Sequence, residues 1–439
     1  MQRRAPSGLA GSLTTWSLAA LAAGLALGLL LHRGGGGPLA GLPALIGPVG
    51  QLWLNALQIT VLPLVVTQML VAIMGGAGGH TLGSLGGRAL ILFLTLLVAA
   101  GIFTLAVAPP MIALYPADPD AAAAMRAATS VPAAAAGAAD GSGGDWLSSL
   151  LPGNLIQAAA DGDVLPLLLF TILFGLAATR LPDDSRRLLA GFARAAADAM
   201  MQLVRWILVV TPVGVFALSL ELAAGAGLGA AGFMAAFVVI VSIAMLLFTA
   251  VLYPVTTLAG RVPLRAFAAA TAPAQLVAVS TRSSIASLPA LVEGARDRLR
   301  LSEAATGLAL PLSVSVFKIN RTISSTVKLL FMAYAFGIPI GAGALATFVV
   351  TVIILSFSSV GVPGGGSAFR TLPAYLAAGA PIEAVVILEA VDTIPDIFKT
   401  LLNVTGDMSV AAILTRGDRV PGLPAPAAVP VAGSVPAPP

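Results

Sequence analysis

Six polar or charged residues in the segment 392–407 are spaced so that they would share one face of an α-helix. Their offsets from the first of them are 4, 7, 8, 11 and 15 positions, which follow the 3.6-residue period of a helix. Apolar residues fill the other faces. In a bilayer each charge would cost about 2.5–3.5 kcal/mol, so this face must contact protein or water and predicts a substrate or ion pathway. The six residues are Asp392, Asp396, Lys399, Thr400, Asn403 and Asp407.

The composition places this helix in a membrane. Hydrophobic residues make up 58% of the 439 residues and charged residues only 10%, and the mean hydropathy is +0.98. Soluble domains carry about 25% charged residues, so these charges are too few to cover a solvated surface. Apolar runs close to the length that spans a bilayer recur, for example at 89–108 and 233–253. We therefore predict an all-α polytopic membrane protein.

Basic residues cluster in alternate loops, which predicts the orientation of the chain. By the positive-inside rule, the N-terminus, the loops at 180–187 and 296–300 and the C-terminus lie in the cytoplasm, with the helices in the inner (plasma) membrane. These clusters need no nucleic acid as a partner. The chain has no cysteine, and His32 and His80 are too few for a metal cluster. We therefore expect neither a metal nor a cofactor.

Two interruptions rich in Gly, Pro and Ser break the apolar segments of the last third. They are TRSSIASLP at 281–289 and SFSSVGVPGGGS at 356–367. Irregular backbone at membrane depth is tolerated only where it lines protein or a cavity. We therefore predict two re-entrant hairpins whose tips can bind a carboxylate or an ion. Earlier in the chain we expect helices near 10–31, 44–75, 86–114, 150–179, 187–220 and 230–256, and an external loop at 117–144.

These motifs resemble those of the glutamate transporter homologues, the dicarboxylate/amino-acid:cation symporters. TRSSIASLP is similar to the tip of the first hairpin of that family, and GVPGGG (361–366) to the tip of the second. NVTGD (403–407) resembles the signature in the last helix, and the likeness extends from about residue 10 to 416. The resemblance implies eight transmembrane helices, two re-entrant helical hairpins and a homotrimer.

The resemblance also implies a static scaffold and a mobile transport domain that moves as an elevator. The scaffold would comprise 1–75 (spans 1 and 2) and 112–222 (external loop, spans 4 and 5). The transport domain would comprise 76–111 (span 3) and 223–416 (span 6, first hairpin, span 7, second hairpin, span 8). The Pro- and Ala-rich tail at 417–439 is expected to be disordered.

The same resemblance implies an amino-acid site between the hairpin tips and the last helix. Ser283 and Ser284 would hold the α-carboxylate of the substrate, and Val362 and Gly366 would border it from the second tip. Asp396 would pair with the substrate ammonium. An acidic residue there would repel a plain dicarboxylate, so an amino acid is expected.

Three more residues complete the implied site. Thr400 and Asn403 would hydrogen-bond the amino-acid backbone. Lys399 occupies the position at which carriers of acidic amino acids hold an arginine for the side-chain carboxylate. Glutamate or aspartate is therefore the expected substrate.

The chain departs from the family pattern at the sodium site. Sodium needs oxygen ligands, yet apolar residues stand at four positions where the family places polar ones. The family's Asn-Met-Asp-Gly-Thr signature corresponds to Phe317, Lys318, Ile319, Asn320 and Arg321, and its adjacent Thr-Ser pair in the third span corresponds to Leu96 and Leu97. We therefore expect sodium coupling to be abolished or strongly altered.

Asp392 and Asp407 remain and would be costly in a low dielectric without a cation. We predict that a tethered cation, foremost the ammonium of Lys318, stands where sodium would and neutralises one of them. Arg321 would offer a fork for a distal carboxylate. Alternatively, Lys318 and Arg321 form purely structural ion pairs with these aspartates.

Other interpretations stay open. The polar face could be a packing face with Asp396 and Lys399 paired, and Glu389 could be a protonatable group or could face a neighbouring helix. The transporter could instead carry a dicarboxylate or a neutral amino acid with sodium or protons, or exchange substrates passively. An anion channel is a remote alternative. An intramembrane enzyme would need a Lys or His base beside Ser283, or paired motif aspartates on facing helices, and neither pattern is present.

Overall fold

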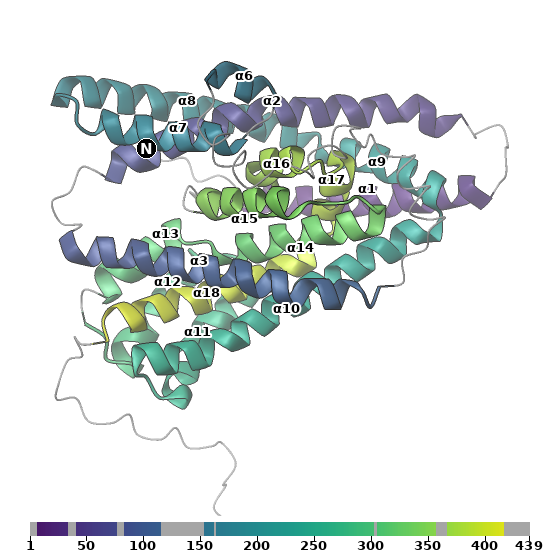
Figure 1. Cartoon of the computed structure of the whole chain (residues 1–439). Helices are drawn as coiled ribbons and strands as arrows, with labels where there is room; N and C mark the ends of the chain where they lie inside the picture. Colours follow the sequence, from purple (N-terminus) through teal and green to yellow (C-terminus); the bar gives the residue numbers. More distant parts are fainter. Residues whose placement is uncertain are drawn as a thin grey trace, which may run out of the picture.

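The computed structural model describes residues 7–33, 41–76, 83–115, 153–161, 164–302, 305–356 and 367–416. Within these ranges the chain is helical and contains no strand, so the predicted all-α membrane fold is confirmed (Figure 1). The expected external loop at 117–144, the tail at 417–439, Val362 and Gly366 lie outside the described residues.

The first helices follow the apolar segments. By length and apolar composition, four helices of the described part can cross a membrane, or five when the bent pair α8–α9 counts as one. The helices up to residue 260 are α1 (Ser7–Arg33), α2 (Leu42–Gly76), α3 (Gly83–Ile112), α6 (Leu155–Asp161), α7 (Val164–Ala178), α8 (Asp183–Val209), α9 (Thr211–Ala226) and α10 (Leu228–Gly260).

The segment 187–220, expected to be one helix, is two. The helices α8 and α9 are bent by 55° at Val210. Pro212 lies in the first turn of α9, where its ring has no N–H to continue the hydrogen-bond ladder of α8. The connection between the helices expected at 187–220 and 230–256 is also shorter, because Gly227 alone joins α9 to α10 with a φ of 57°. That conformation costs glycine little.

Close backbone contacts fix α1, α2 and α9 to one another. A Cβ atom at Gly24 would lie 2.1 Å from Ser219 Oγ, and one at Gly28 would lie 2.6 Å from the backbone oxygen of Leu220. Two glycines four residues apart let membrane helices approach in this way. Gly50 of α2 packs against Leu218 of α9 in the same manner. These helices therefore form one tightly packed unit.

The first predicted hairpin is present. Helix α11 (Leu264–Thr281) ends at Arg282 with a φ of 51°, and α12 (Leu288–Glu293) with the π-helix η4 (Gly294–Arg298) returns beside it. A Cβ atom at Gly294 would lie 2.1 Å from the oxygen of Ala270, so the two limbs are in contact. The residues that flank the second interruption, α15 (Ala342–Ser356) and α16 (Ser367–Ala377), also lie side by side, with the rings of Phe348 and Tyr375 5.1 Å apart.

Two further breaks interrupt the helices near the polar motifs. Phe317 and Lys318 separate α13 (Leu310–Val316) from α14 (Ile319–Phe336), after the π-helix η5 (Ala305–Ala309). Val391 and Asp392 separate α17 (Ile382–Ala390) from α18 (Thr393–Leu414). The predicted polar helix is α18. The segment 317–321, which corresponds to the family's Asn-Met-Asp-Gly-Thr signature, lies at the break between α13 and α14.

The helices form two groups with the broken segments between them. In Figure 1, α2, α7 and α8 lie along one side, α3, α10, α11 and α18 along the other, and α15, α16 and α17 lie between. One hydrophobic cluster joins α3, α10 and α14, where Phe233 stacks on Phe331 with centroids 5.0 Å apart. A second cluster packs the first hairpin on α13 and α18 through Phe267, Leu310 and Met408. The polar face of α18 is thereby enclosed.

Candidate functional site

The polar face of α18 is largely enclosed by protein. Lys399, Thr400, Asn403 and Asp407 are buried, and Asp396 is half-buried. Asp396 is influenced by the charge of Arg282, in the tip of the first hairpin. The first tip and the first turn of α18 are thus close together.

Lys399 forms a buried ion pair with Asp392, not with Asp396. Asp392 precedes the first residue of α18, and the break at 391–392 lets its carboxylate reach a lysine seven residues later. The second carboxylate oxygen, Oδ1, is buried and has no hydrogen-bond partner in the described part of the chain. The alternative packing face with Asp396 and Lys399 as a pair is therefore not what the structure shows.

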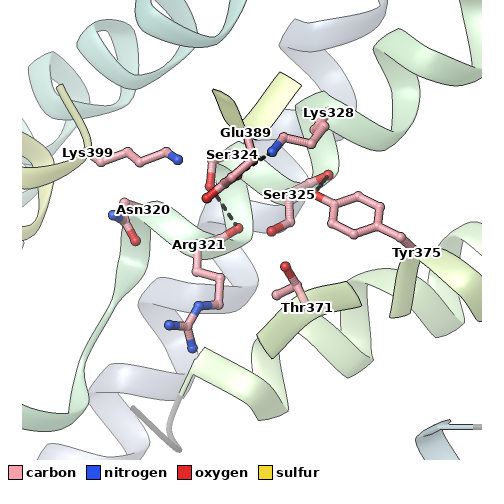
Figure 2. A pocket seen from close by; sticks show the side chains of 9 residues that line it. All are labelled: Asn320, Arg321, Ser324, Ser325, Lys328, Thr371, Tyr375, Glu389 and Lys399. Carbon is pink, nitrogen blue, oxygen red and sulfur yellow. Dashed lines mark hydrogen bonds and ion pairs between the residues drawn. The ribbon is translucent and has the colours of Figure 1, made fainter. Parts of the chain in front are cut away.

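A small polar cavity of about 20 Å³ lies beside this pair. Its volume is sufficient for a water molecule. Figure 2 shows Lys399 pointing toward this space from one side and Glu389 with Lys328 from the other. The lining residues come from α14, α16, α17 and α18: Asn320, Arg321, Ser324, Ser325, Lys328, Thr371, Tyr375, Glu389 and Lys399.

A second buried ion pair joins α14 to α17. Lys328 Nζ lies 2.7 Å from Glu389 Oε2, and the two side chains are only 3% and 10% exposed. Lys328 Nζ also lies 5.6 Å from the ring centroid of Phe237, within the range of a cation–π contact. Glu389 thus faces a neighbouring helix.

Lys328 was not among the site residues predicted from the sequence. Its signal is a second polar stripe, because Arg321, Ser324, Ser325 and Lys328 have offsets of 0, 3, 4 and 7 on α14. All four line the cavity.

Arg321 and Tyr375 tie the helices around the cavity together. Arg321 is buried and its Nη1 donates to the backbone oxygen of Leu355 at 2.6 Å. Tyr375 donates its hydroxyl to the oxygen of Ser325 at 3.1 Å. The first bond connects α14 to the end of α15 and the second connects α16 to α14, so both limbs of the second hairpin are anchored on α14.

Lys318 connects the first hairpin tip to the break before α14. Its ammonium donates to Ser284 Oγ at 3.1 Å and to the oxygen of Val314. It also attracts Asp407 electrostatically. Asp407 is fully buried, and the hydroxyl of Ser313 also stabilises its carboxylate, although the contact is outside the geometry of a full hydrogen bond. A fixed positive charge thus stands near a buried carboxylate.

Hydrocarbon fills the region beside Asp407. Phe317 stacks on Phe93 with centroids 4.8 Å apart and planes inclined by 14°. A Cβ atom at Gly406 would lie 3.3 Å from Ile319 Cγ2 and 3.4 Å from Phe317 Cε1. The side chains of Leu96 and Leu97 are buried in the same cluster.

The remaining predicted residues, Asn403, Thr400 and Ser283, form hydrogen bonds within the protein. Asn403 Oδ1 accepts the backbone N–H of Asn320 at 3.2 Å, and Thr400 donates to the oxygen of Asp396 within its own helix. Ser283 Oγ accepts the N–H of Ala286 inside the hairpin turn. The structure thus brings Lys399 and Arg321 to the cavity. It also brings Lys318 into contact with Ser284 of the first tip.

Comparison with known proteins agrees with this architecture. The model of the sodium:dicarboxylate symporter family matches residues 13–416. The chain is 27% identical to the proton/glutamate-aspartate symporter of Escherichia coli K12, over 92% of each chain. It is 25% identical to the proton/sodium-glutamate symport protein of Bacillus subtilis 168, over 85% of this chain and 86% of that protein. It is also 25% identical to the C4-dicarboxylate transport protein of Rhizobium johnstonii, over 91% and 87%. The chain therefore belongs to the sodium:dicarboxylate symporter family, and it is a multi-pass membrane protein and secondary transporter of the glutamate-transporter-homologue type, not an enzyme.

Proposed function

We propose that the transporter carries an acidic amino acid, glutamate or aspartate, across the plasma membrane without the usual sodium coupling of its family. The observation that carries the substrate class is the basic lining of the polar cavity. Arg321, Lys328 and Lys399 line it together with one acidic side chain, Glu389. Lys328 is paired with Glu389 and Lys399 with Asp392, so an anionic group would bind here by replacing Asp392 at Lys399, with Arg321 beside it.

Lys399 is the residue that we assign to the distal carboxylate of the substrate. In the structure it binds Asp392, so a carboxylate of the substrate would take the place of Asp392 as its anionic partner. Arg321, whose guanidinium is buried beside the same cavity, would supply further donors. Asp396, half-buried near the first tip, would receive the ammonium.

The hydrocarbon beside Asp407 supports the loss of sodium coupling. Phe317, Ile319, Leu96 and Leu97 offer no oxygen ligand, and their side chains are buried in one cluster. Lys318 supplies a fixed charge that attracts Asp407. We assign to Lys318 the role of a tethered cation in place of sodium.

The packing supports the division into two domains and an elevator motion. Glycine-mediated contacts fix α1, α2 and α9 together, as a static scaffold requires. The two ion pairs and the hydrogen bonds of Arg321 and Tyr375 bind α14–α18 into another unit. We propose that this second unit, with α3 and α10–α13, moves along the first, and that three copies assemble as a homotrimer with both termini in the cytoplasm.

A dicarboxylate is the second candidate substrate. The Rhizobium relative is named a C4-dicarboxylate transport protein, and basic residues around the cavity would also suit such a substrate. Asp396 argues against it, because a carboxylate in place of the ammonium would be repelled.

Binding titrations distinguish these candidates. Purified protein is titrated calorimetrically with glutamate, aspartate, a neutral amino acid and malate, each in sodium and in choline buffer. We expect heat and thermal stabilisation from glutamate or aspartate in both buffers. Stabilisation by malate alone would overturn the role of Asp396, and binding only in sodium would overturn the tethered cation.

Proteoliposomes then test transport itself. We expect uptake of the bound amino acid in sodium-free choline buffer. Strict sodium dependence would contradict the proposal. An imposed pH gradient that leaves the rate unchanged would exclude proton coupling.

A further inference from the structure

Two carboxyl groups lie against one turn of α2, away from the cavity, where the proposed scaffold contacts the proposed transport domain. Glu383 lies in the first turn of α17 and is 6% exposed. Its Oε1 accepts a hydrogen bond from Gln51 Nε2 of α2 at 2.9 Å. Its Oε2 is buried and has no hydrogen-bond partner in the described part of the chain. A buried acceptor without a donor destabilises the fold, so a donor is expected there.

Glu221 of α9 is the other carboxyl group. It is half-buried and repels Glu383 electrostatically. A Cβ atom at Gly47 of α2 would lie 3.0 Å from Glu221 Oε2. Because Gly47 and Gln51 are one helical turn apart, they share a face of α2. Both carboxyl groups therefore lie against the same turn of α2.

The surrounding helices offer this pair little positive charge. Neither α2 nor α10 has a charged residue between its printed bounds. Lys328 of α14 is paired with Glu389, and His32 of α1 is directed to the backbone oxygen of Ala224 at 2.9 Å. Arg33, at the end of α1, is exposed. Among the described side chains, Glu221 and Glu383 form no ion pair with any of these groups.

Two neighbouring carboxylates in a low dielectric cannot readily both remain ionised. A single proton shared between them removes the repulsion and creates the donor that Glu383 Oε2 lacks. We infer that Glu221 and Glu383 form a proton-binding site between the two domains, and that the bound proton holds α17 against α2 and α9.

This site has a consequence for transport, which rests on the proposed elevator motion. When α17 moves along the scaffold, the Gln51–Glu383 bond breaks and the carboxyl groups separate. The proton can then no longer be shared by the two carboxyl groups. Proton binding therefore disfavours the domain movement, and the movement weakens proton binding. Loss of the proton at higher pH restores the repulsion and releases the domain. The pair acts as a latch that slows transport at low pH.

Glutamine substitutions imitate the protonated pair. In Glu383→Gln the amide oxygen still accepts from Gln51, and its NH2 group can donate to Glu221. In Glu221→Gln the amide can donate to Glu383 Oε2. We expect both variants to transport at one slow rate over the whole pH range, equal to the rate of the wild type at low pH. Their substrate affinity should be unchanged. Glu293→Gln, at an exposed glutamate of α12, is the matched control and keeps the wild-type profile.

The experiment measures uptake into proteoliposomes with equal pH on both sides, from about pH 5.5 to about pH 8. We expect the wild-type rate to rise several-fold over this range, and the rise to be absent in the two glutamine variants. Gel filtration and thermal unfolding establish that each variant is folded. A pH profile that is unchanged in Glu383→Gln and in Glu221→Gln would overturn the latch.

Infrared spectroscopy tests the shared proton without any substrate. The carbonyl stretch of a protonated carboxyl group should titrate in the wild type and in Glu293→Gln, and this band should be missing in both other variants. Persistence of the full band would overturn the proton site. If the proposed substrate is wrong, the wild type shows no uptake at any pH, whereas the infrared titration still decides whether the proton is bound.

Discussion

Lys328 of α14 and Glu389 of α17 form a buried ion pair, with Nζ 2.7 Å from Oε2. A second buried pair joins Lys399 of α18 to Asp392, which directly precedes that helix. The four charges influence one another across α14, α17 and α18. Burying such charges is costly, and the cost is offset only while each charge keeps its partner. Each lysine beside the polar cavity therefore needs an anionic partner, which for Lys399 is Asp392 or, in the proposed function, the carboxylate of a substrate.

We expect Lys328→Met to destabilise the protein by about 3–5 kcal/mol, because it leaves Glu389 buried without its cation. The double variant Lys328→Met with Glu389→Met should recover most of this loss, since two apolar side chains of similar length replace the pair. Thermal unfolding in detergent measures both. A double variant no more stable than the single one would show that the charges act independently.

Lys399→Gln tests the assignment of the distal carboxylate. A hydrogen bond to a charged group contributes about 1.5–3 kcal/mol, so affinity for glutamate or aspartate should fall by about 10- to 100-fold. Calorimetric titration measures the change. Because the substitution also leaves Asp392 unpaired, Lys399→Gln with Asp392→Asn serves as the control. If the double variant binds glutamate as tightly as the wild type, Lys399 does not hold the substrate.

The helical stripe of α18 could be predicted because a 3.6-residue period and membrane depth are both visible in the sequence. The partner of Lys399 could not be predicted in this way. Its pairing with Asp392 depends on the chain leaving the helix at 391–392, and although Pro395 marks this break, it does not reveal which carboxylate Lys399 reaches. The bend at Val210 had a signal, since Pro212 follows it, but prolines also lie inside continuous membrane helices, as Pro63 and Pro254 do here.

Contacts between distant segments were beyond local reasoning. The bond between Gln51 and Glu383 joins residues 332 positions apart, and neither residue belongs to a motif. The stripe that contains Lys328 is visible in the sequence, but Lys328 lies two helical turns beyond Arg321, the last residue of the family signature at 317–321. The apolar replacements at Phe317 and Ile319 are evident from the sequence alone. The structure shows in addition that the ring of Phe317 stacks on Phe93.

Lys318→Met tests the tethered cation. Removing the ammonium leaves Asp407 buried without the charge that attracts it, and it removes a hydrogen-bond donor from Ser284 Oγ. We expect a loss of about 1–3 kcal/mol in stability. Adding Asp407→Asn should restore part of it, because the neutral amide no longer needs a cation. Unfolding curves in sodium and in choline buffer measure these effects, and equal losses in the single and double variants would contradict a link between Lys318 and Asp407.

The absence of cysteine from the sequence allows a direct test of the elevator motion. Cysteines at positions 51 and 383 replace the side chains that meet between α2 and α17, so oxidation or a short bis-thiol linker should join the two proposed domains. Uptake should fall at least tenfold when the link forms and should recover after reduction, since a joined transport domain cannot move. The matched control links positions 50 and 218, which are in contact between α2 and α9 inside the proposed scaffold. That link should leave uptake unchanged. Full uptake by a protein whose positions 51 and 383 are demonstrably linked would mean that α17 does not move against α2, and it would remove the physical basis of the elevator and of the latch together.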